Sequence, residues 1–583
     1  MSGLSTSPAR WSSRDGHPGT REERTVTEGR DPGHEFDRKM ASYLTELRQS
    51  WTSRRGFLKL AAGSAGAATL TAALGGASTA GSKRLLPGLH VLAQDETSVV
   101  FALEGDVRGL EPALSYDFTA NPVVCNISEG LMMFTAEGGL EPLIAETFEQ
   151  PDALTYVYTL RDGVVFSDGM PVTADDVVAS IARVRDPEVA GPLAWMYDVP
   201  EAVVEKTDDT TITIKLTTPS ALFRYVPATT AGHVIPAAAI EQYGLDLLRN
   251  PIGTGPYKFV RWDAGSQIEL EKNTNYWQEG KPHFERFIYQ IVEEGTTRIT
   301  GLKNGELDIV NSVPPDQLEA IAEFPNVDLQ DVVGYTISMV ALRTDKPPFD
   351  DVNVRKAVSY ATPLQSIMEN IVGANGIQSR NTTVPPDMPG SASAELEPIP
   401  YDVDKAKELM AASASPDGFS TKLNVIAPND IWVPQAVAIQ EALREINIDV
   451  EIVQMPYADM ITLQQAGDYE GMMHFQWGSD FPDAAGNLIP LFLSTNTPPQ
   501  NNHAFYNNPE VDRLLNESES ELDEEARLEM LREAQRIISD DQPAMFLEHF
   551  KWFLPMSTRL TGYTLSPLWY WDAIGRDLMP ASA

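Results

Sequence analysis

The side chains best suited to covalent chemistry do not form a recognisable catalytic set in this 583-residue chain. The single cysteine, Cys125, would need a partnered histidine to act as a nucleophile, and none of the eight histidines lies in a known signature. A lone cysteine is more often a small buried hydrophobic residue, and it offers neither a disulfide framework nor a CxxC metal site. We therefore predict a protein that is not an enzyme, with no catalytic residue, no cofactor and no bound metal.

The glycine-rich stretch "GTGPY" at residues 253–257 invites comparison with a phosphate-binding loop. It lacks the Lys-Ser/Thr ending, and Pro256 removes a backbone donor where one is needed. The GxSxG, HExxH and SxxK signatures are not apparent where a fold would use them. An exported hydrolase remains an alternative, because among 83 acidic residues paired carboxylates are inevitable and carry no information.

The stretch "HFQWGSDFPDAAG" at residues 474–486 places one carboxylate, Asp480, three residues after Trp477. A carboxylate in a closed cleft of low dielectric holds a cation strongly when hydrogen bonds offset its desolvation. A neighbouring tryptophan would add a rigid wall and a cation–π contact. The alternative is a plain turn, since Gly-Ser-Asp before Phe-Pro-Asp is good loop chemistry by itself.

Strands and helices alternate along the chain and would have to position these side chains. Residues 210–216 and 448–453 alternate apolar and polar side chains, which predicts half-buried strands. Residues 524–541 carry an apolar stripe at helical spacing, and Thr173 with Asp176 predicts a capped helix start. The pattern indicates an α/β fold without internal repeats.

An export signal is predicted near the N-terminus. Arg54 and Arg55 precede a long run of small, mildly apolar residues, and "SRRGFLK" at residues 53–59 resembles the twin-arginine motif read by the machinery that exports folded proteins. Cleavage is expected after Ala80 or Ala93, and a retained membrane anchor is the alternative. Residues 1–39 are polar and read as disordered, so Met40 is a second candidate start. The protein is therefore expected in the periplasm or on the outer face of the cytoplasmic membrane.

Acidic residues dominate the charge of the chain. The 44 basic and 83 acidic residues give a net charge of −39, and because residues 1–93 hold 13 basic and 8 acidic residues, the remainder carries about −44. Such a surface repels nucleic acid and anionic membranes and steers cationic solutes. We expect no nucleic-acid partner, and solubility in a salty environment is the simplest explanation of the charge.

Seven segments, in order, resemble one family: the extracytoplasmic solute-binding proteins of the dipeptide/oligopeptide/nickel class (family 5), which feed ABC importers. The order of the seven is far more specific than any one of them. They are "LTYVYTLRDGVVFSDGMPVTADDVVASIARVRDP" (154–187), "PIGTGPYKFVRW" with "IELEKNTNYW" (251–277), "GLKNGELDIV" (301–310), "PPFDDVNVRKAVSYA" (347–361), "YDVDKAKELM" (401–410), "WGSDFPD" (477–483) and "NPEVDRLL" (508–515).

The resemblance implies an α/β fold of two lobes, of the type II periplasmic-binding-protein kind, closing over a buried ligand. It also implies an extra subdomain on the first lobe and two hinge crossovers, near residues 334–342 and 548–555. The expected divisions are the N-terminus and export signal (1–93), the first part of lobe 1 (94–141), the extra subdomain (142–250), the second part of lobe 1 (251–333), the hinge crossover (334–347), lobe 2 (348–546) and the hinge return with the lobe 1 tail (547–583).

The resemblance also implies the ligand site. Asp480 matches the aspartate that pairs with the α-ammonium of a bound peptide. Tyr116, Asp117 and Phe118 line up with a segment whose extended backbone pairs with the ligand, although a loop before a helix near residue 121 explains them equally well. The remaining candidate ligand contacts are Trp477, Tyr335, Trp432 and His474; for Tyr335 and Trp432, packing is at least as good an explanation.

One departure bears on the ligand. Dipeptide binders of this family often hold the ligand carboxylate with an arginine, but the comparable stretch "APNDIWVPQ" at residues 427–435 has none. Longer peptides, other cationic solutes, or carbohydrate stacked on tryptophan remain open. Nickel held by a histidine cluster is disfavoured, because His474 and His503 stand apart in sequence; a metal arriving already chelated stays an alternative.

The predicted function is capture of a solute, first of all an oligopeptide, and its delivery to the membrane permease subunits of an ABC importer. A monomer is expected. Alternatives are a binder of carbohydrate or chelated metal, an exported hydrolase, and a sensor or chaperone-like binder that uses the same cleft without a permease.

Overall fold

The computed structural model describes residues 96–198 and 200–581. The predicted export motif at Arg54 and Arg55, the cleavage points after Ala80 and Ala93, and the second start at Met40 lie outside these residues. Within the described ranges no helix is both long enough and apolar enough to cross a membrane.

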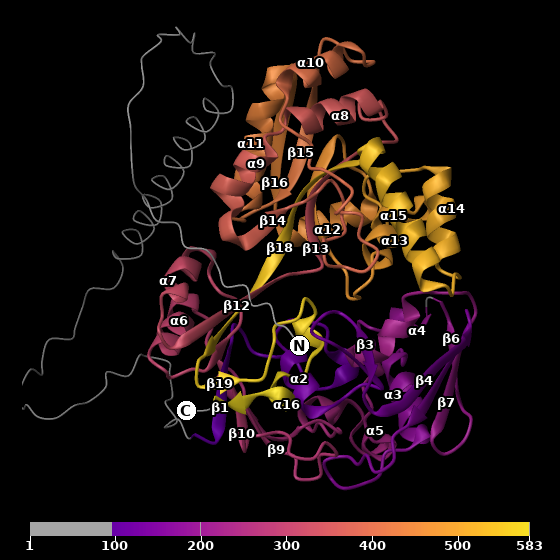
Figure 1. Ribbon diagram of the computed structural model, residues 1–583, viewed down its shortest axis with the longest axis vertical. Coiled ribbons are helices and arrows are strands. Elements are labelled where there is room, and N and C mark those ends of the chain that lie inside the picture. The colour runs from indigo at the N-terminus through magenta and orange to yellow at the C-terminus, as the bar shows by residue number, and fades with distance from the viewer. Residues whose placement is uncertain (1–95, 199, 582–583) are drawn as a thin grey trace, which may run out of the picture. The chain divides into compact units, whose positions relative to one another are not determined.

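One long strand, β18 (Ala544–Ser557), joins two groups of strands into a single sheet (Figure 1). Its first half pairs with β13 (Thr336–Leu342) and β14 (Gly376–Gln378). Its second half pairs with β12 (Val327–Val333) and β11 (Ile309–Val310). We call the group around β11 and β12 lobe 1 and the group around β13 and β14 lobe 2.

Two chain segments therefore cross side by side from one lobe to the other. Strand β18 changes partners between Phe550 and Lys551. In the other segment only Gly334 and Tyr335 separate β12 from β13. These positions fall within the predicted hinge crossovers.

The lobe 1 sheet is built around β1 (Ser98–Leu103), in which all six residues are buried. It pairs in parallel with β10 (Arg286–Ile291) and β11, while β9 (Gln267–Lys272) and β8 (Tyr257–Asp263) extend the sheet antiparallel. A strand buried on both faces is typical of a parallel pair covered by helices and loops.

A separate four-stranded antiparallel sheet has the order β4 (Ala145–Asp152), β5 (Thr155–Leu160), β7 (Thr211–Leu216), β6 (Ala202–Lys206). Strand β7 confirms the strand predicted over residues 210–216. Helix α3 (Ala174–Val184) contacts β6 and β7. It starts with the reciprocal Thr173–Asp176 capping box that the sequence predicts.

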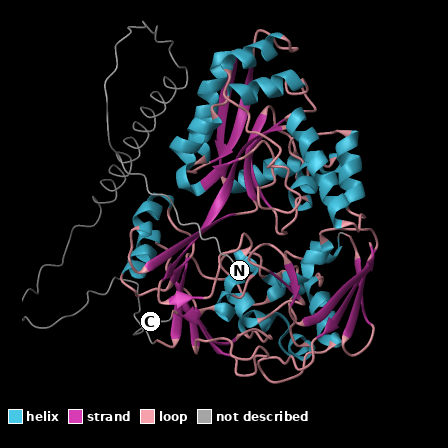
Figure 2. Ribbon diagram, in the orientation of Figure 1, coloured by secondary structure: helices cyan, strands magenta, loops and turns pink. Residues whose placement is uncertain are grey.

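Lobe 2 has the strand order β16 (Ile448–Met455), β15 (Phe419–Ile426), β17 (Met472–Gly478), β13. Strand β16 confirms the strand predicted from residue 448, and α15 (Glu524–Asp541) matches the predicted helix. Helices lie on both sides of this sheet (Figure 2).

The other helices are α2 (Asn121–Ile127), α4 (Trp195–Asp198), α5 (Ala237–Tyr243), α6 (Gly295–Lys303), α7 (Leu318–Ala322), α8 (Val352–Ala361), α9 (Leu364–Ile367), α10 (Val403–Ala411), α11 (Trp432–Leu443), α12 (Tyr457–Ala466), α13 (Ala485–Phe492), α14 (Pro509–Ser518) and α16 (Ile574–Asp577). The other strands are β2 (Met132–Phe134), β3 (Leu140–Pro142), β19 (Leu560–Thr561) and β20 (Met579–Pro580). Short 3-10 helices are η1 (Pro112–Leu114), η2 (Phe223–Ala228), η3 (Thr230–Gly232), η4 (Gly244–Arg249), η5 (Pro315–Gln317), η7 (Gly373–Asn375), η8 (Arg444–Ile446), η9 (Ser494–Asn496) and η10 (Trp569–Trp571); a π-helical turn, η6, spans Met368–Val372.

The mixed α/β class predicted from the sequence is confirmed. A single cluster of buried apolar residues continues from lobe 1 into lobe 2 and includes Tyr225, Tyr335 and Phe481. The lobes are thus packed together around the crossover, while the residue limits proposed for each domain stay predictions.

Candidate functional site

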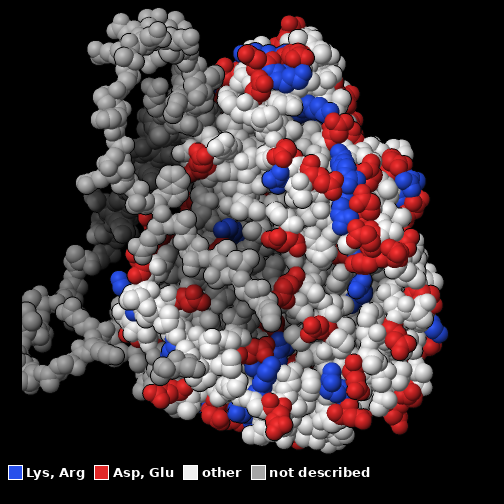
Figure 3. All heavy atoms as spheres, in the orientation of Figure 1, with Lys and Arg blue, Asp and Glu red and all other residues white. Residues whose placement is uncertain are grey.

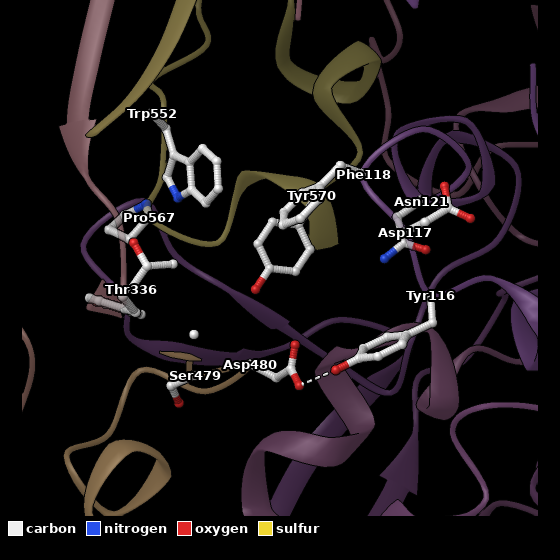
Figure 4. Close-up of a pocket in the computed structure, with 12 residues that line it drawn as sticks. Tyr116, Asp117, Phe118, Asn121, Thr336, Ser479, Asp480, Trp552, Pro567 and Tyr570 are labelled. Carbon is white, nitrogen blue, oxygen red and sulfur yellow. Dashed lines mark hydrogen bonds between the residues drawn. The ribbon is translucent and has the colours of Figure 1, made fainter. Parts of the chain in front are cut away.

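A cavity of about 220 Å³ lies where the two lobes meet (Figure 4). Four separate parts of the chain contribute to its wall: the loop before α2, the β12–β13 crossover, the loop after β17, and the region from β18 to η10. The lining residues are Tyr116, Asp117, Phe118 and Asn121; Tyr335 and Thr336; Gly478, Ser479 and Asp480; and Trp552, Pro567 and Tyr570. Five of the eight predicted ligand contacts are therefore brought together: Tyr116, Asp117, Phe118, Tyr335 and Asp480.

The loop after β17 holds Asp480 by backbone and side-chain hydrogen bonds. The last β17 residue, Gly478, pairs with Thr336 of β13, and the Ser479 amide donates to the Tyr335 carbonyl over 3.0 Å. The Ser479 hydroxyl accepts from the Phe481 amide at 3.1 Å and lies 2.8 Å from the Phe481 carbonyl. Asp480 is thus fixed directly beside the crossover.

The Asp480 carboxylate links the two lobes through Tyr116. The Tyr116 hydroxyl donates to Oδ2 of Asp480 over 2.7 Å, across 364 residues of sequence. The other oxygen, Oδ1, points into the cavity (Figure 4). One oxygen is therefore bound by the protein, and the other faces the space that a ligand would occupy.

The surroundings of Asp480 disfavour its charged form. Burial raises the pKa of its carboxyl to about 6, and the hydrogen bond from Tyr116 opposes this only in part. No lysine, arginine or histidine is among the described residues that line the cavity. A bound cation would supply the missing countercharge.

Aromatic rings form much of the remaining wall. Phe118 packs edge-on against Tyr570, with ring centroids 4.8 Å apart, and lies 5.3 Å from Trp552. Tyr116 stacks on Trp571 at 6.1 Å. Phe118 and Tyr116 remain 43% and 41% exposed, so each leaves apolar surface facing the cavity. Such unfilled apolar surface is typical of a binding site.

The crossover glycine allows Trp552 to reach this wall. A β-carbon added at Gly334 would lie 2.3 Å from Nε1 of Trp552, a distance that no side chain permits. The absence of a side chain at Gly334 therefore lets the indole pack directly on the crossover backbone.

Asp117 has a structural task within the site. Its Oδ1 accepts hydrogen bonds from the amides of Thr119 and Ala120 at 2.9 and 2.7 Å, which organises the turn before α2. The alternative interpretation, a loop before a helix, thus describes this residue well, although it also lines the cavity.

Trp477, Trp432 and His474 do not line the cavity. The Trp477 indole donates to the Gly486 carbonyl over 3.0 Å and packs on the hydrophobic core. The Trp432 ring lies 5.1 Å from the His474 ring. His474 is fully buried, with Nε2 3.0 Å from Oε1 of Gln435, and burial lowers its pKa to about 3, so it is neutral. A ligand role for these three residues stays a prediction; their contacts are those of packing residues.

Trp552, Pro567 and Tyr570 contribute to the wall without having been predicted. Trp552 lies in the stretch predicted as the second crossover, and the run "WYW" at residues 569–571 was a compositional signal of an aromatic cluster. Neither signal says which ring faces a cavity, because that depends on how β18 passes between the lobes.

The remaining chemical candidates do not form a second centre. Cys125 is buried, as expected of a small hydrophobic residue, and burial raises its pKa strongly. Over residues 96–198 and 200–581, no three or more histidine, cysteine, aspartate or glutamate side chains are grouped so as to hold a metal ion.

Comparison with known proteins gives a consistent result. The sequence model of the bacterial extracellular solute-binding proteins, family 5 (middle), matches residues 139–499. The glutathione-binding protein GsiB of Salmonella typhi is 30% identical over 480 residues, which cover 80% of this chain and 92% of that protein.

Two solved structures show the same fold. HbpA2 from Haemophilus parasuis has 25% identity and a TM-score of 0.77, over 83% of this chain and 100% of its own. The ABC transporter-associated periplasmic binding protein DppA from Helicobacter pylori, in complex with the peptide STSA, has 26% identity and a TM-score of 0.67, over 83% and 98% of the two chains. These likenesses confirm the predicted two-lobe α/β fold.

Proposed function

Because the chain belongs to the bacterial extracellular solute-binding proteins of family 5 and is thus the substrate-binding component of an ABC importer, we propose that it captures a solute with an ammonium group held by Asp480. An oligopeptide is the first candidate. The protein would act outside the cytoplasm, after export by the twin-arginine signal, as a monomer that delivers the solute to the permease subunits.

The observation that carries the proposal is a carboxylate without a cationic partner in the cavity between the lobes. Oδ1 of Asp480 faces the cavity, and no cationic side chain lines the described wall. An ammonium group at this point would form a charge-assisted hydrogen bond and offset the desolvation of the carboxylate.

The position of Asp480 also couples binding to closure. Asp480 belongs to lobe 2, whereas Tyr116 and Phe118 belong to lobe 1. A solute that touches all three stabilises the arrangement in which the lobes meet, as in hinge closure around a ligand. Two of the three named relatives support an ammonium-bearing ligand, because glutathione, bound by GsiB, and the peptide STSA, bound by DppA, each have a free amino group.

Native mass spectrometry of gently purified protein tests the proposal. Wild-type protein should retain adducts, and masses spaced by amino-acid residues would identify peptides. Asp480→Asn should lose them, because the amide keeps the shape but not the charge. Asp449→Asn, an exposed aspartate on β16, is the matched control and should retain them.

If the protein retains a single adduct of one discrete mass, the ligand is one specific solute and not a mixture of oligopeptides. If the Asp480→Asn variant retains as much adduct as the Asp449→Asn variant, the role given to Asp480 is contradicted.

A further inference from the structure

The charged side chains that line the described part of the cavity are all acidic. Two of its lining residues, Asp117 and Asp480, are acidic, and the rest of the described wall is neutral. Asp480 shows the consequence: burial raises its pKa, and only a neutral hydroxyl, that of Tyr116, opposes the shift. A carboxylate of the ligand would meet like charge here and find only neutral donors.

On the lobe 1 side, the wall of the cavity is largely apolar. Phe118, Trp552, Tyr570 and Pro567 face Asp480 from the lobe 1 side (Figure 4). Aromatic faces attract a cation within about 6 Å of the ring centre, most strongly where water is excluded. A zwitterion would bring one charge that the wall attracts and a second that it rejects.

Size adds a limit. The cavity has a volume of about 220 Å³. This is less than the roughly 300–1,000 Å³ of sites that enclose a drug-sized ligand. The cavity therefore holds a compact group, and any longer part of a ligand extends beyond it.

From these observations we infer that the cavity selects a hydrophobic organic cation: an ammonium group attached to an apolar or aromatic body, with no carboxylate inside the cavity. The inference rests on the proposed function and specifies the chemistry of its ligand. Two kinds of ligand have an ammonium group on an apolar body: a free aromatic amine, and the amino end of a longer peptide whose carboxyl end lies outside the cavity.

Titration calorimetry with three probes that share one benzyl group tests this selection. Phenethylamine and phenylalaninamide carry the ammonium without a carboxylate, whereas phenylalanine carries both. The first two should bind wild-type protein at least tenfold more tightly than phenylalanine. A tripeptide that begins with phenylalanine separates the two sources: binding as tight as that of phenylalaninamide would identify a peptide end, and weaker binding a free amine.

Two variants test the aromatic contribution. Phe118→Leu should weaken phenethylamine binding roughly three- to thirtyfold, because the ring face is lost while the apolar volume is largely kept. Tyr457→Leu removes an exposed aromatic ring from α12, outside the cavity, and should leave binding unchanged. Both side chains are exposed, so neither change should prevent folding.

The inference would be overturned if phenylalanine bound as tightly as phenylalaninamide. It would also be overturned if none of the three small probes, phenethylamine, phenylalaninamide and phenylalanine, bound to the protein. Neither result would decide the proposed function, which depends on whether purified protein retains a solute through Asp480. Equal effects of Phe118→Leu and Tyr457→Leu would remove the aromatic part of the inference.

Discussion

At the scale of single residues, the candidate site contains a buried carboxylate whose charge lowers the stability of the folded protein. Asp480 is held in a largely apolar cavity with one hydroxyl as its partner, although a carboxylate on the surface would keep its full hydration. Buried groups of this kind, with a pKa shifted by desolvation, are characteristic of functional sites. Asp480 thus has the properties expected of a residue retained for binding.

The first prediction concerns the stability of Asp480→Asn. The folded-state pKa of about 6 lies above the ordinary aspartate value of 3.8, so the folded protein binds this proton more tightly than the unfolded chain does. Stability from this group is fully present below pH 3.8 and is lost as pH rises through 6. At neutral pH the charge costs at most roughly 3 kcal/mol, and less because the side chain is partly exposed.

Asp480→Asn should therefore raise the free energy of unfolding of ligand-free protein by about 1–3 kcal/mol at pH 7.5, and by nothing near pH 3.8. Urea unfolding at the two pH values measures the difference. Asp449→Asn should show no such gain. A variant less stable than wild type at pH 7.5 would mean that the charge is satisfied in the folded protein.

At the scale of elements, the loop that carries Asp480 is held by contacts with α15. Asp483, three residues after Asp480, is fully buried and receives two hydrogen bonds from Arg527 of α15, at 3.2 and 2.6 Å. The Tyr225 hydroxyl of η2 adds a third contact to Asp483 at 3.3 Å. Helix α15 therefore anchors the loop that presents Asp480, from a position outside the cavity.

The second prediction follows from this buried pair. Arg527→Met leaves the Asp483 carboxylate buried without its countercharge and should lower the free energy of unfolding by about 3–5 kcal/mol. Adding Asp483→Leu to it should recover a large part of that loss, because the unpaired charge is then gone. Urea unfolding of the two variants decides the point. A double variant that is less stable than Arg527→Met would show that the aspartate is needed for its other contacts.

At the scale of the whole molecule, net charge dominates the electrostatics. A chain with a net charge of −39 repels itself. Among the described residues, many basic side chains form ion pairs, both with near neighbours and across the sequence. On α15, Arg532 and Arg536 pair with neighbouring glutamates, and basic and acidic side chains alternate over this helix in Figure 3. Such exposed pairs contribute little each, so the unbalanced acidic charge remains the larger effect.

The third prediction is that salt stabilises the protein. The screening length falls from about 10 Å at 0.1 M to about 3 Å at 1 M salt, which weakens repulsion between distant carboxylates. The melting temperature should rise by several degrees between low and high potassium chloride concentration. Differential scanning calorimetry measures it, and a melting temperature that stays constant or falls would show that the ion pairs outweigh the repulsion.

Local patterns in the sequence determined the parts of this protein that depend on neighbouring residues. The alternation in residues 210–216 predicted β7, the Thr173–Asp176 pair predicted the start of α3, and the order of seven segments indicated the two-lobe fold. The loop at Asp480 was also found from sequence, because an acidic residue between turn formers after a strand is a local feature. Periodicity and capping act over a few residues and can be read directly.

The tertiary structure alone decided which side chains face Asp480. Tyr116 is 364 residues away from it, and its hydroxyl arrives there only because the lobes meet. The sequence pointed to Trp477 as a ligand contact, which stays a prediction; its indole donates a hydrogen bond to the Gly486 carbonyl. Trp552, which the sequence did not single out, lines the cavity because β18 crosses between the lobes beside Gly334. Contacts of this kind depend on the path of the whole sheet, and no local spacing records that path.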